Sequence, residues 1–233
     1  MLVYGRNVAI ELLQNPKKIK KVFLQTGFDD KKIKLILENS DLTIIYKDKK
    51  ELDRLAESSH QGIILDIEDY KYHSLKDLLT EEENSVIVLL DHLEDPHNLG
   101  AIIRTCEAAG IDGIVLPKDR GVKVTPTVMK TSAGALENIK LALVTNLSQT
   151  IDVLKKEGYW IVGTDMINSQ DYRTIDYSGK IVLVIGNEGN GMSRIVRESC
   201  DFIASIPMKG KVNSLNASVA AGIMIYEAIR NRK

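Results

Sequence analysis

The sequence predicts an α/β protein in which a larger, mainly parallel sheet follows a smaller α/β unit. From Val86 onward, continuous apolar runs alternate with helical patterns, as expected for strands that helices cover on both faces. The segment before it, 1–70, alternates in the same way, with shorter β-like runs. Positions 66–84, where the two parts meet, lose this periodicity and gather acidic side chains. We therefore expect a domain over residues 1–70, a linker over 71–84 and a second domain over 85–233.

The composition is that of an ordinary globular protein. The chain has 233 residues, of which 44% are hydrophobic and 27% charged, and its formal net charge is −1. These values argue against a disordered or disulfide-rich chain and against a strongly basic nucleic-acid binder. No apolar run approaches the roughly 18 to 20 residues that span a bilayer, and the N-terminus lacks a secretion pattern. Cys106 and Cys200 form no CxxC pair and have no histidine at zinc-site spacing, so we expect no metal and a reducing cytoplasm.

Helical and strand patterns alternate in the N-terminal part of the chain. Helical spacing covers 7–14, 31–39 and 49–56, and β-like runs begin at Val22 (VFLQ), Leu42 (LTIIY) and Gly62 (GIILDI). Four lysines flank one short segment: Lys17, Lys18, Lys20 and Lys21. They are either a solvated turn or contacts to RNA phosphates, and the sequence alone leaves both interpretations open.

Six apolar runs predict the strands of the second domain. They are VIVLL from Val86, GIVLP from Gly113, LALV from Leu141, WIVGT from Trp160, IVLVIG from Ile181 and FIASIP from Phe202. Helices are expected over about 98–110, near Thr125, before Gly158 and over about 215–230. Ligands bind beyond the carboxyl ends of parallel strands, so the loops after these runs are the places to search for a site.

The loop after VIVLL contains a helix start and an arginine. Asn98 is a candidate helix cap, and Gly100 permits a close approach of the backbone. Arg104 either pairs on the surface with Glu107 or Asp91, or is a charge placed among apolar residues for a functional reason.

The loop after IVLVIG is rich in glycine. It reads GNEGNGMS over 186–193, and its three glycines allow the backbone to wrap a ligand. The order of the glycines does not match a Rossmann fingerprint, and Met192 stands where a P-loop needs lysine. Hydrolysis of nucleoside triphosphates is therefore unsupported. Glu188, an acid in a glycine-rich turn after a buried strand, is a candidate site residue.

The segment after FIASIP leads into the last helix. Asn213, Ser214 and Asn216 cluster at the helix start, and Ser214 is the candidate cap. Capping leaves the two asparagines unexplained. The helix also presents a face of small residues suited to close packing: Ala217, Ala220, Ala221 and Gly222.

Together, these three segments resemble the motifs of the SpoU family, also called the TrmH family, of S-adenosylmethionine-dependent RNA ribose 2′-O-methyltransferases. NLGAIIRTCEAAG resembles the first motif, VIGNEGNGM the second and IPMKGKVNSLNASVAAGI the third, in the family's order. TPTVMKTSAGALE resembles the segment between the first two. VYGRNVAIELL and HQGII, both within 1–70, resemble the L30e-like RNA-binding domain of the longer members. By architecture the chain is most similar to the bacterial 23S rRNA guanosine 2′-O-methyltransferases.

The resemblance implies a SPOUT-type fold, in which the C-terminal segment of a parallel α/β sheet threads a loop and forms a deep trefoil knot. It also implies a homodimer that packs the first and last helices of the catalytic domain against the partner, and it implies no metal. S-adenosylmethionine would lie in the knotted loops, held mostly by backbone groups. The cofactor-binding positions carried over are Thr164, Gly186, Gly189, Ile206, Asn213 and Leu215.

For catalysis, the resemblance points to Arg104. A guanidinium stays protonated in proteins, with a pKa above about 12, so we expect Arg104 to hold a substrate phosphate and to stabilise the developing alkoxide. The proton would go to that phosphate or to water. The residues expected to orient Arg104 and the ribose are Asn98, Glu188, Ser214 and Asn216.

The implied function is 2′-O-methylation of structured RNA in the cytoplasm, most specifically of a guanosine in 23S rRNA. A tRNA 2′-O-methyltransferase and a non-catalytic RNA-binding or ribosome-binding relative are the alternatives. The intact set of Asn98, Arg104, Glu188 and Asn216 argues against the non-catalytic relative. A small-molecule nucleotide enzyme would need phosphate-binding fingerprints, which the sequence lacks.

Overall fold

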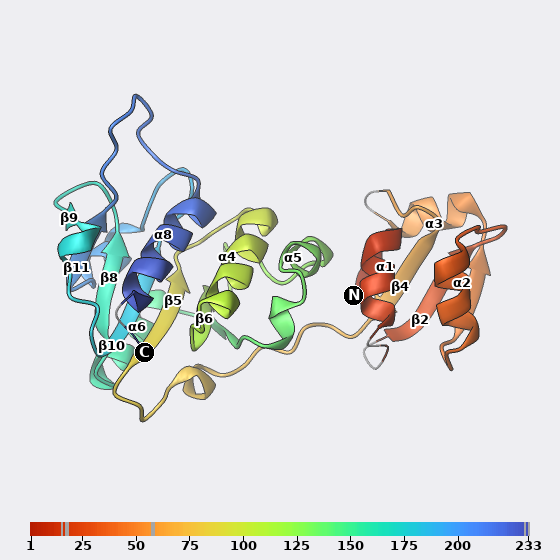
Figure 1. Ribbon diagram of the computed structural model, residues 1–233, viewed down its shortest axis with the longest axis horizontal. Coiled ribbons are helices and arrows are strands. Elements are labelled where there is room, and N and C mark those ends of the chain that lie inside the picture. The colour runs from red at the N-terminus through yellow and green to blue at the C-terminus, as the bar shows by residue number, and fades with distance from the viewer. Residues whose placement is uncertain (15, 17–18, 57–58, 231, 233) are drawn as a thin grey trace. The chain divides into compact units, whose positions relative to one another are not determined.

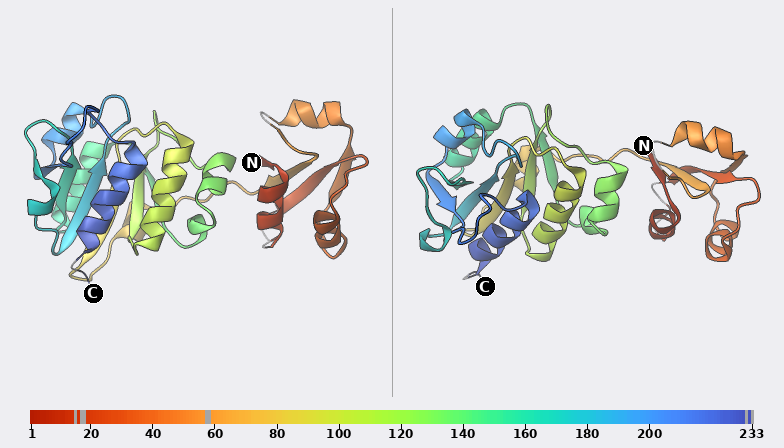
Figure 2. Two further views of the ribbon diagram at one scale, coloured as in Figure 1. Left: turned by 45° about the horizontal axis from the view of Figure 1, so that its top comes forward. Right: turned by 90° about the horizontal axis from the view of Figure 1, so that it is seen from above.

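The computed structural model describes residues 1–14, 16, 19–56, 59–230 and 232 (Figure 1). The chain divides into two compact units, Met1–Lys71 and Tyr72–Lys233. Each unit has its own sheet with helices on both faces (Figure 2). The predicted α/β class is confirmed.

The N-terminal unit contains a four-stranded sheet in the order β1-β4-β2-β3. Its strands are β1 (Leu2–Tyr4), β2 (Ile19–Gln25), β3 (Ile44–Lys47) and β4 (Ile63–Ile67). β2 and β3 are parallel, and β4 runs antiparallel to both β1 and β2. The helices are α1 (Arg6–Leu13), α2 (Lys31–Glu38) and α3 (Lys49–Leu55). Figure 2 shows α3 on one face of this sheet and α1 and α2 on the other.

Local signals place the helices of the N-terminal unit. Asp30 caps α2 by accepting from the backbone N–H groups of Lys32 and Ile33, and Asp48 begins α3 with a capping box that includes Glu51. Buried apolar side chains then determine which face of each helix packs on the sheet. Phe23, Leu52 and Ile64 form the core between α3 and the sheet. β1 was not predicted, because so short a strand shows no alternating pattern.

The C-terminal unit contains a seven-stranded sheet in the order β7-β6-β5-β10-β8-β11-β9, and all of its strand pairs are parallel. The strands are β5 (Ser85–Leu90), β6 (Gly113–Pro117), β7 (Leu141–Val144), β8 (Trp160–Thr164), β9 (Gln170–Asp171), β10 (Lys180–Ile185) and β11 (Phe202–Ser205). β5, β6 and β10 are almost wholly buried, which explains their continuous apolar sequences. The predicted parallel sheet is confirmed.

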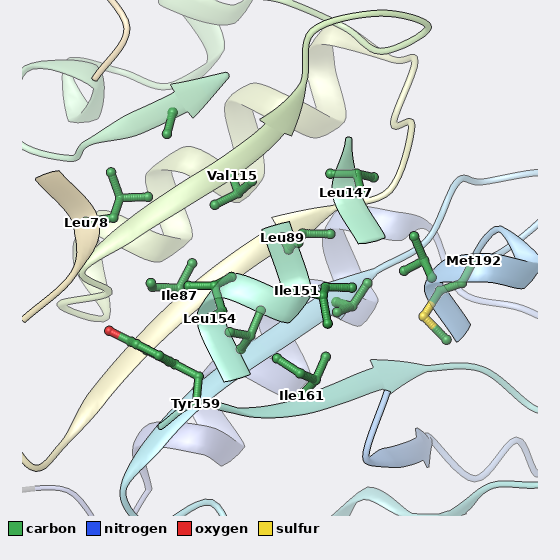
Figure 3. Close-up of a cluster of buried hydrophobic side chains, with 14 residues drawn as sticks. Leu78, Ile87, Leu89, Val115, Leu147, Ile151, Leu154, Tyr159, Ile161 and Met192 are labelled. Atoms are coloured by element: carbon green, nitrogen blue, oxygen red, sulfur yellow. The ribbon is translucent and has the colours of Figure 1, made fainter. Parts of the chain in front are cut away.

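Helices cover both faces of the larger sheet (Figure 2). They are α4 (Pro96–Ala108), α5 (Pro126–Thr131), α6 (Leu147–Lys156), α7 (Arg194–Glu198) and α8 (Ala217–Ile229), with short 3-10 helices η2 (Leu75–Leu78), η3 (Ala135–Glu137) and η4 (Tyr172–Thr174). α4 packs against α8 on one face. On the other face Leu147, Ile151 and Leu154 of α6 meet Ile87 and Leu89 of β5 (Figure 3).

The expected linker over 71–84 belongs largely to the C-terminal unit. The backbone N–H of His73 donates to the carbonyl of Leu141 at 2.8 Å, and Leu78 is 1% exposed. Gly113 has no side chain where Leu78 packs, since a Cβ there would lie 2.4 Å from the Leu78 Cγ. The acidic residues of this segment gave no indication in the sequence that it packs on the sheet. Leu75 and Leu78 of η2 nevertheless hold the segment against the C-terminal unit.

Two predicted helix caps are wrong. α4 begins earlier than expected, because Asp95 accepts from the N–H of His97 and Pro96 occupies the first turn. α8 is capped by Asn216 instead of Ser214. The deep trefoil knot remains a prediction, since strand order does not define how a loop is threaded. In the described part of the chain, no helix is long and apolar enough to cross a membrane.

Candidate functional site

A cavity of about 460 Å³ opens where β8, β10 and β11 end and α8 begins. Eight of the predicted catalytic and cofactor-binding residues line it: Thr164, Gly186, Glu188, Gly189, Ile206, Asn213, Ser214 and Leu215. All six predicted cofactor positions are in this set. Asn98, Arg104 and Asn216 are not on the wall. The loops that follow β8, β10 and β11 therefore surround one space.

The glycine loop, residues 186–193, is folded tightly on itself. Asn187 and Gly191 exchange two backbone hydrogen bonds, of 2.9 and 3.0 Å. A Cβ on Gly186 would lie 2.4 Å from the carbonyl carbon of Gly191 and 2.5 Å from the Met192 nitrogen. Only glycine fits at position 186 without moving the loop. The constraint comes from the chain's own backbone, which shapes the wall of the cavity.

Side-chain hydrogen bonds join the first loop to the glycine loop. Asn98 is buried and donates from Nδ2 to Oε1 of Glu188 at 2.8 Å. Asn187 donates from its own Nδ2 to the carbonyl of His92 at 2.8 Å. Asn98 therefore orients the Glu188 carboxylate at the cavity wall, a different role from the helix cap expected from the sequence.

Arg104 lies exposed on α4, and neither expected partner holds it. Asp91 is fully buried, accepts from the Ser193 backbone N–H at 2.6 Å and contacts Nδ1 of His92 at 2.5 Å. Glu107 accepts instead from the side chain of Asn138 at 3.2 Å. Among the described residues, Arg104 forms no hydrogen bond or ion pair. Its guanidinium remains available to a ligand.

The third loop supplies polar groups beside α8. Oδ1 of Asn216 accepts from the N–H of Ser218 at 2.9 Å and from its hydroxyl at 2.6 Å, so this oxygen is committed to capping. Ser214 is exposed at the cavity wall. α8 packs against α4, and a Cβ on Gly222 would lie at an ordinary contact distance, 4.0 Å, from Cγ2 of Thr105. Thr105 is next to Arg104 on α4. The third loop therefore leads into α8, the helix that packs against the helix of Arg104.

An ion pair on the cavity wall was missed in the sequence. Asp165 follows the last residue of β8, and its carboxylate contacts the guanidinium of Arg197 on α7. The side chains are 10% and 31% exposed. A polar residue directly after a buried strand was the available signal for Asp165. Nothing in the sequence links it to Arg197, which lies on a helix far along the chain.

The four lysines proposed for RNA contact have different settings. Lys17 and Lys18 lie outside the described residues. Lys20 is exposed. Nζ of Lys21 lies 3.6 Å from Asp66 and 5.4 Å from the ring centroid of Phe23, so this lysine is held within its own unit. Among the residues that the structure describes, no group of three or more His, Cys, Asp or Glu side chains could hold a metal ion.

Comparison with known proteins decides between the alternatives for the fold and the family. The model of the SpoU rRNA Methylase family matches residues 85–226, and a model described as RNA 2′-O ribose methyltransferase substrate binding matches residues 2–73. A Bacillus subtilis protein named as a TrmH family tRNA/rRNA methyltransferase, YacO, is 44% identical over 99% of this chain and 95% of its own. The chain belongs to the SpoU/TrmH family.

Solved structures of the family support the same conclusion. AviRb of Streptomyces viridochromogenes, in complex with AdoMet, has a TM-score of 0.82 and 26% identity over all of this chain and 90% of its own. An AdoMet-bound rRNA methyltransferase of Sinorhizobium meliloti has a TM-score of 0.75 and 30% identity over all of this chain and 87% of its own. A TrmH/SpoU tRNA modifying enzyme of A. aeolicus, 34% identical with a TM-score of 0.60, covers 68% of this chain and 80% of its own.

This family member uses S-adenosylmethionine as its cofactor, and the cavity suits that molecule. The backbone at Gly186 leaves no room for a Cβ, and the wall combines apolar side chains such as Ile206 and Leu215 with polar and charged ones such as Asn213 and Glu188. Nε of Arg197 is buried without a hydrogen-bond partner, so a donor is available beside the space. The resemblance drawn from the three motifs is confirmed. The chain is a SpoU/TrmH RNA methyltransferase.

Proposed function

We propose that this methyltransferase modifies the ribose 2′-hydroxyl of structured RNA, and most specifically of a guanosine in 23S rRNA. Two observations carry this proposal: Asn98 orients the acid Glu188 at the wall of the cofactor cavity, and Arg104 is exposed on α4 with no hydrogen bond or ion pair among the described residues. These are the polar groups that a ribose and its phosphate need. The matched family models support RNA as the substrate class.

Catalysis requires alignment of the hydroxyl and removal of its proton. When bound, S-adenosylmethionine supplies an electrophilic methyl group. Arg104 holds a phosphate of the substrate and stabilises negative charge on the 2′-oxygen, because a guanidinium cannot act as a base near neutral pH. The proton passes to that phosphate or to water. Glu188, Ser214 and the side-chain amide group of Asn216 orient the ribose, and Asn98 acts through Glu188.

The division of labour between the units is supported by the two family models, of which one matches each unit. Residues 85–233 carry catalysis, and residues 1–70 bind the RNA. Of the four lysines singled out in the sequence, Lys20 is the described one available for a phosphate contact, since it is exposed and Lys21 is already paired. Lys17 and Lys18 are further candidates from the sequence.

Ribosomal RNA is favoured over tRNA by the extent of similarity. The AdoMet-bound rRNA methyltransferase of S. meliloti covers the whole chain, including the N-terminal unit. The A. aeolicus tRNA modifying enzyme covers 68% of it. The name of the Bacillus relative includes both RNA classes, so tRNA is the second candidate.

We further propose that the enzyme is a homodimer in the cytoplasm. Val219 and Tyr226 of α8 are about half exposed on a helix that also carries small residues, and Arg104 is exposed on the adjacent α4. Two copies that pack through α4 and α8 would cover this apolar surface and bring Arg104 to a shared site. Cys106 and Cys200 are both free thiols, in keeping with a reducing compartment.

The decisive experiment maps 2′-O-methylated nucleotides in rRNA and tRNA from cells with and without the gene. We expect one guanosine of 23S rRNA to lose its modification and to regain it with the wild-type gene but not with Arg104→Ala. Loss at a tRNA position would establish the second candidate. An unchanged map, together with purified protein that transfers no methyl group to either RNA, would establish the non-catalytic alternative.

A further inference from the structure

The Asp165–Arg197 pair supplies two of the three charged residues on the cavity wall within the described chain. The third, Glu188, accepts from Asn98 at 2.8 Å. Arg197 is the cation of this set. The pair therefore places one positive and one negative group side by side on a wall whose other lining side chains, apart from Glu188, are uncharged.

Asp165 is held rigidly at this position. Its backbone N–H donates to the carbonyl of Ala204 at 3.0 Å, and its Oδ1 accepts from the N–H of Ile167 at 3.0 Å. Oδ2 contacts Arg197, and a Cβ on Gly191 would lie 3.7 Å from this oxygen. The carboxylate thus lies against the glycine loop. Each carboxylate oxygen can accept more than one hydrogen bond, so capacity remains for a ligand.

The guanidinium of Arg197 has N–H donors that its contact with Asp165 does not use. A guanidinium has five N–H groups, and its one recorded contact in the described chain is with Asp165. Its Nε is buried and has no hydrogen-bond partner. A buried donor without an acceptor destabilises the folded state, unless a bound molecule supplies the acceptor after a small shift of the side chain. The arrangement is therefore incomplete without an anionic or acceptor group from a ligand.

The cofactor carries a matching pair of charges. Its methionine part ends in an ammonium and a carboxylate on the same carbon, and its adenosine part is uncharged. We propose that Asp165 and Arg197 bind this amino-acid end, with the carboxylate at Arg197 and the ammonium at Asp165. The four charges then alternate in sign, which stabilises both ion pairs. This inference rests on the cofactor assignment and does not depend on which RNA is methylated.

Binding of cofactor analogues to the full-length protein tests the proposal. S-adenosylhomocysteine has the amino-acid end, and 5′-methylthioadenosine has the same adenosine thioether without it. By calorimetry, Arg197→Gln and Asp165→Asn should each weaken S-adenosylhomocysteine about 10- to 100-fold, the range for hydrogen bonds to charged groups. Binding of 5′-methylthioadenosine should change less than about 3-fold. The matched control is Arg194→Gln, on the same helix, whose partner Glu198 is at the surface.

A second comparison separates the two roles. Decarboxylated S-adenosylmethionine retains an amine and lacks the carboxylate, so Arg197→Gln should leave its binding unchanged while Asp165→Asn weakens it. Equal losses for S-adenosylhomocysteine and 5′-methylthioadenosine would overturn the proposal and assign the pair to the adenosine. No loss in either variant would reduce the pair to a structural contact. Wild-type protein that binds none of these ligands would refute the cofactor assignment itself, and with it this inference.

Discussion

At the scale of single residues, the site is defined by which polar groups are already occupied. Asp91 is occupied by Ser193 and His92, and Glu188 is held by Asn98. Arg104, by contrast, has no partner among the described residues and is exposed on α4. A charge that the fold does not use can be altered with little effect on stability. Arg104 can therefore be changed to test function separately from folding.

Replacing Arg104 with alanine should reduce the rate of methyl transfer by about 10²- to 10³-fold, the effect of removing one transition-state donor. Cofactor affinity should stay nearly unchanged, because Arg104 is not on the cavity wall. Arg104→Lys should restore little, since lysine lacks the planar group that grips a phosphate with two hydrogen bonds. Transfer of labelled methyl groups to RNA measures the rate, and calorimetry measures the affinity. Full activity in the lysine variant would exclude the phosphate-holding role.

Cys200 should be unreactive in the native protein. Burial raises the pKa of its thiol to about 12, from an ordinary value near 9. At pH 8 the native thiolate fraction should then be about 10³-fold below that of the unfolded chain, and reaction with a disulfide reagent should slow in proportion. Comparing native and guanidinium-unfolded Cys106→Ala protein isolates this thiol. Equal rates in the two states would contradict the prediction.

The same shift has a consequence for stability. A raised pKa in the folded state means that Cys200 contributes fully below pH 9, and that its contribution is lost as the pH rises toward 12. The unfolded chain loses its proton first in that window. The free energy of unfolding should therefore fall there less steeply in Cys200→Ala than in the wild type.

At the scale of elements, the sequence predicted the strands of the larger sheet better than the ends of its helices. Continuous runs such as IVLVIG leave little choice, because a strand buried on both faces must be apolar throughout. Helix ends depend on single hydrogen bonds. Asp95 is the cap of α4, with Pro96 in the first helical position. Asn98 lies within the helix, and its side chain binds Glu188. Contacts of this kind join distant segments, so no local pattern reveals them.

The glycine loop should not tolerate a methyl group at position 186. Its Cβ would lie 2.4 Å from backbone of the same loop, so Gly186→Ala should shift the loop and abolish measurable cofactor binding. Gly210→Ala is the control, because nothing lies within 4 Å of a Cβ there. Calorimetry with S-adenosylhomocysteine and a melting curve for each variant distinguish local from global damage. If Gly186→Ala bound S-adenosylhomocysteine with wild-type affinity, the conclusion that only glycine fits at position 186 would be wrong.

The 3-10 helix η2 should stabilise the C-terminal unit. Leu78 is 1% exposed and belongs to the core cluster that contains Ile87, Val115 and Leu154. Leu78→Ala should lower the free energy of unfolding by about 2 to 5 kcal/mol, through lost burial and a residual cavity. Ile195→Ala, at a side chain that is 65% exposed, should change it by less than about 0.5 kcal/mol. Chemical denaturation measures both, and similar values would show that η2 is only a linker.

At the scale of the whole molecule, the site depends on chain segments that are far apart in sequence. Asn98 and Glu188 are 90 positions apart, and Asp91 and Ser193 are 102 apart. The sheet order brings β5 next to β10 and so makes these contacts possible. Motif order in the sequence allowed the family and the cavity residues to be predicted. The ion pair of Asp165 with Arg197 and the contact of Leu78 with the sheet required the folded chain.

The same reasoning sets where the two units can be separated. A fragment of residues 72–233 retains Leu78 and the pairing of His73 with Leu141, whereas a fragment of residues 85–233 loses both. We expect the longer fragment to melt at a higher temperature and to bind S-adenosylhomocysteine with the affinity of the full chain. Both fragments should methylate structured rRNA poorly, because in our proposal the N-terminal unit and its lysines supply the RNA affinity, and that affinity falls as salt rises. Methyl transfer to rRNA at several salt concentrations, compared with cofactor binding by the same preparations, separates substrate recognition from catalysis. Full-rate methylation of rRNA by residues 72–233 alone would show that the N-terminal unit is dispensable and that RNA recognition resides in the catalytic unit.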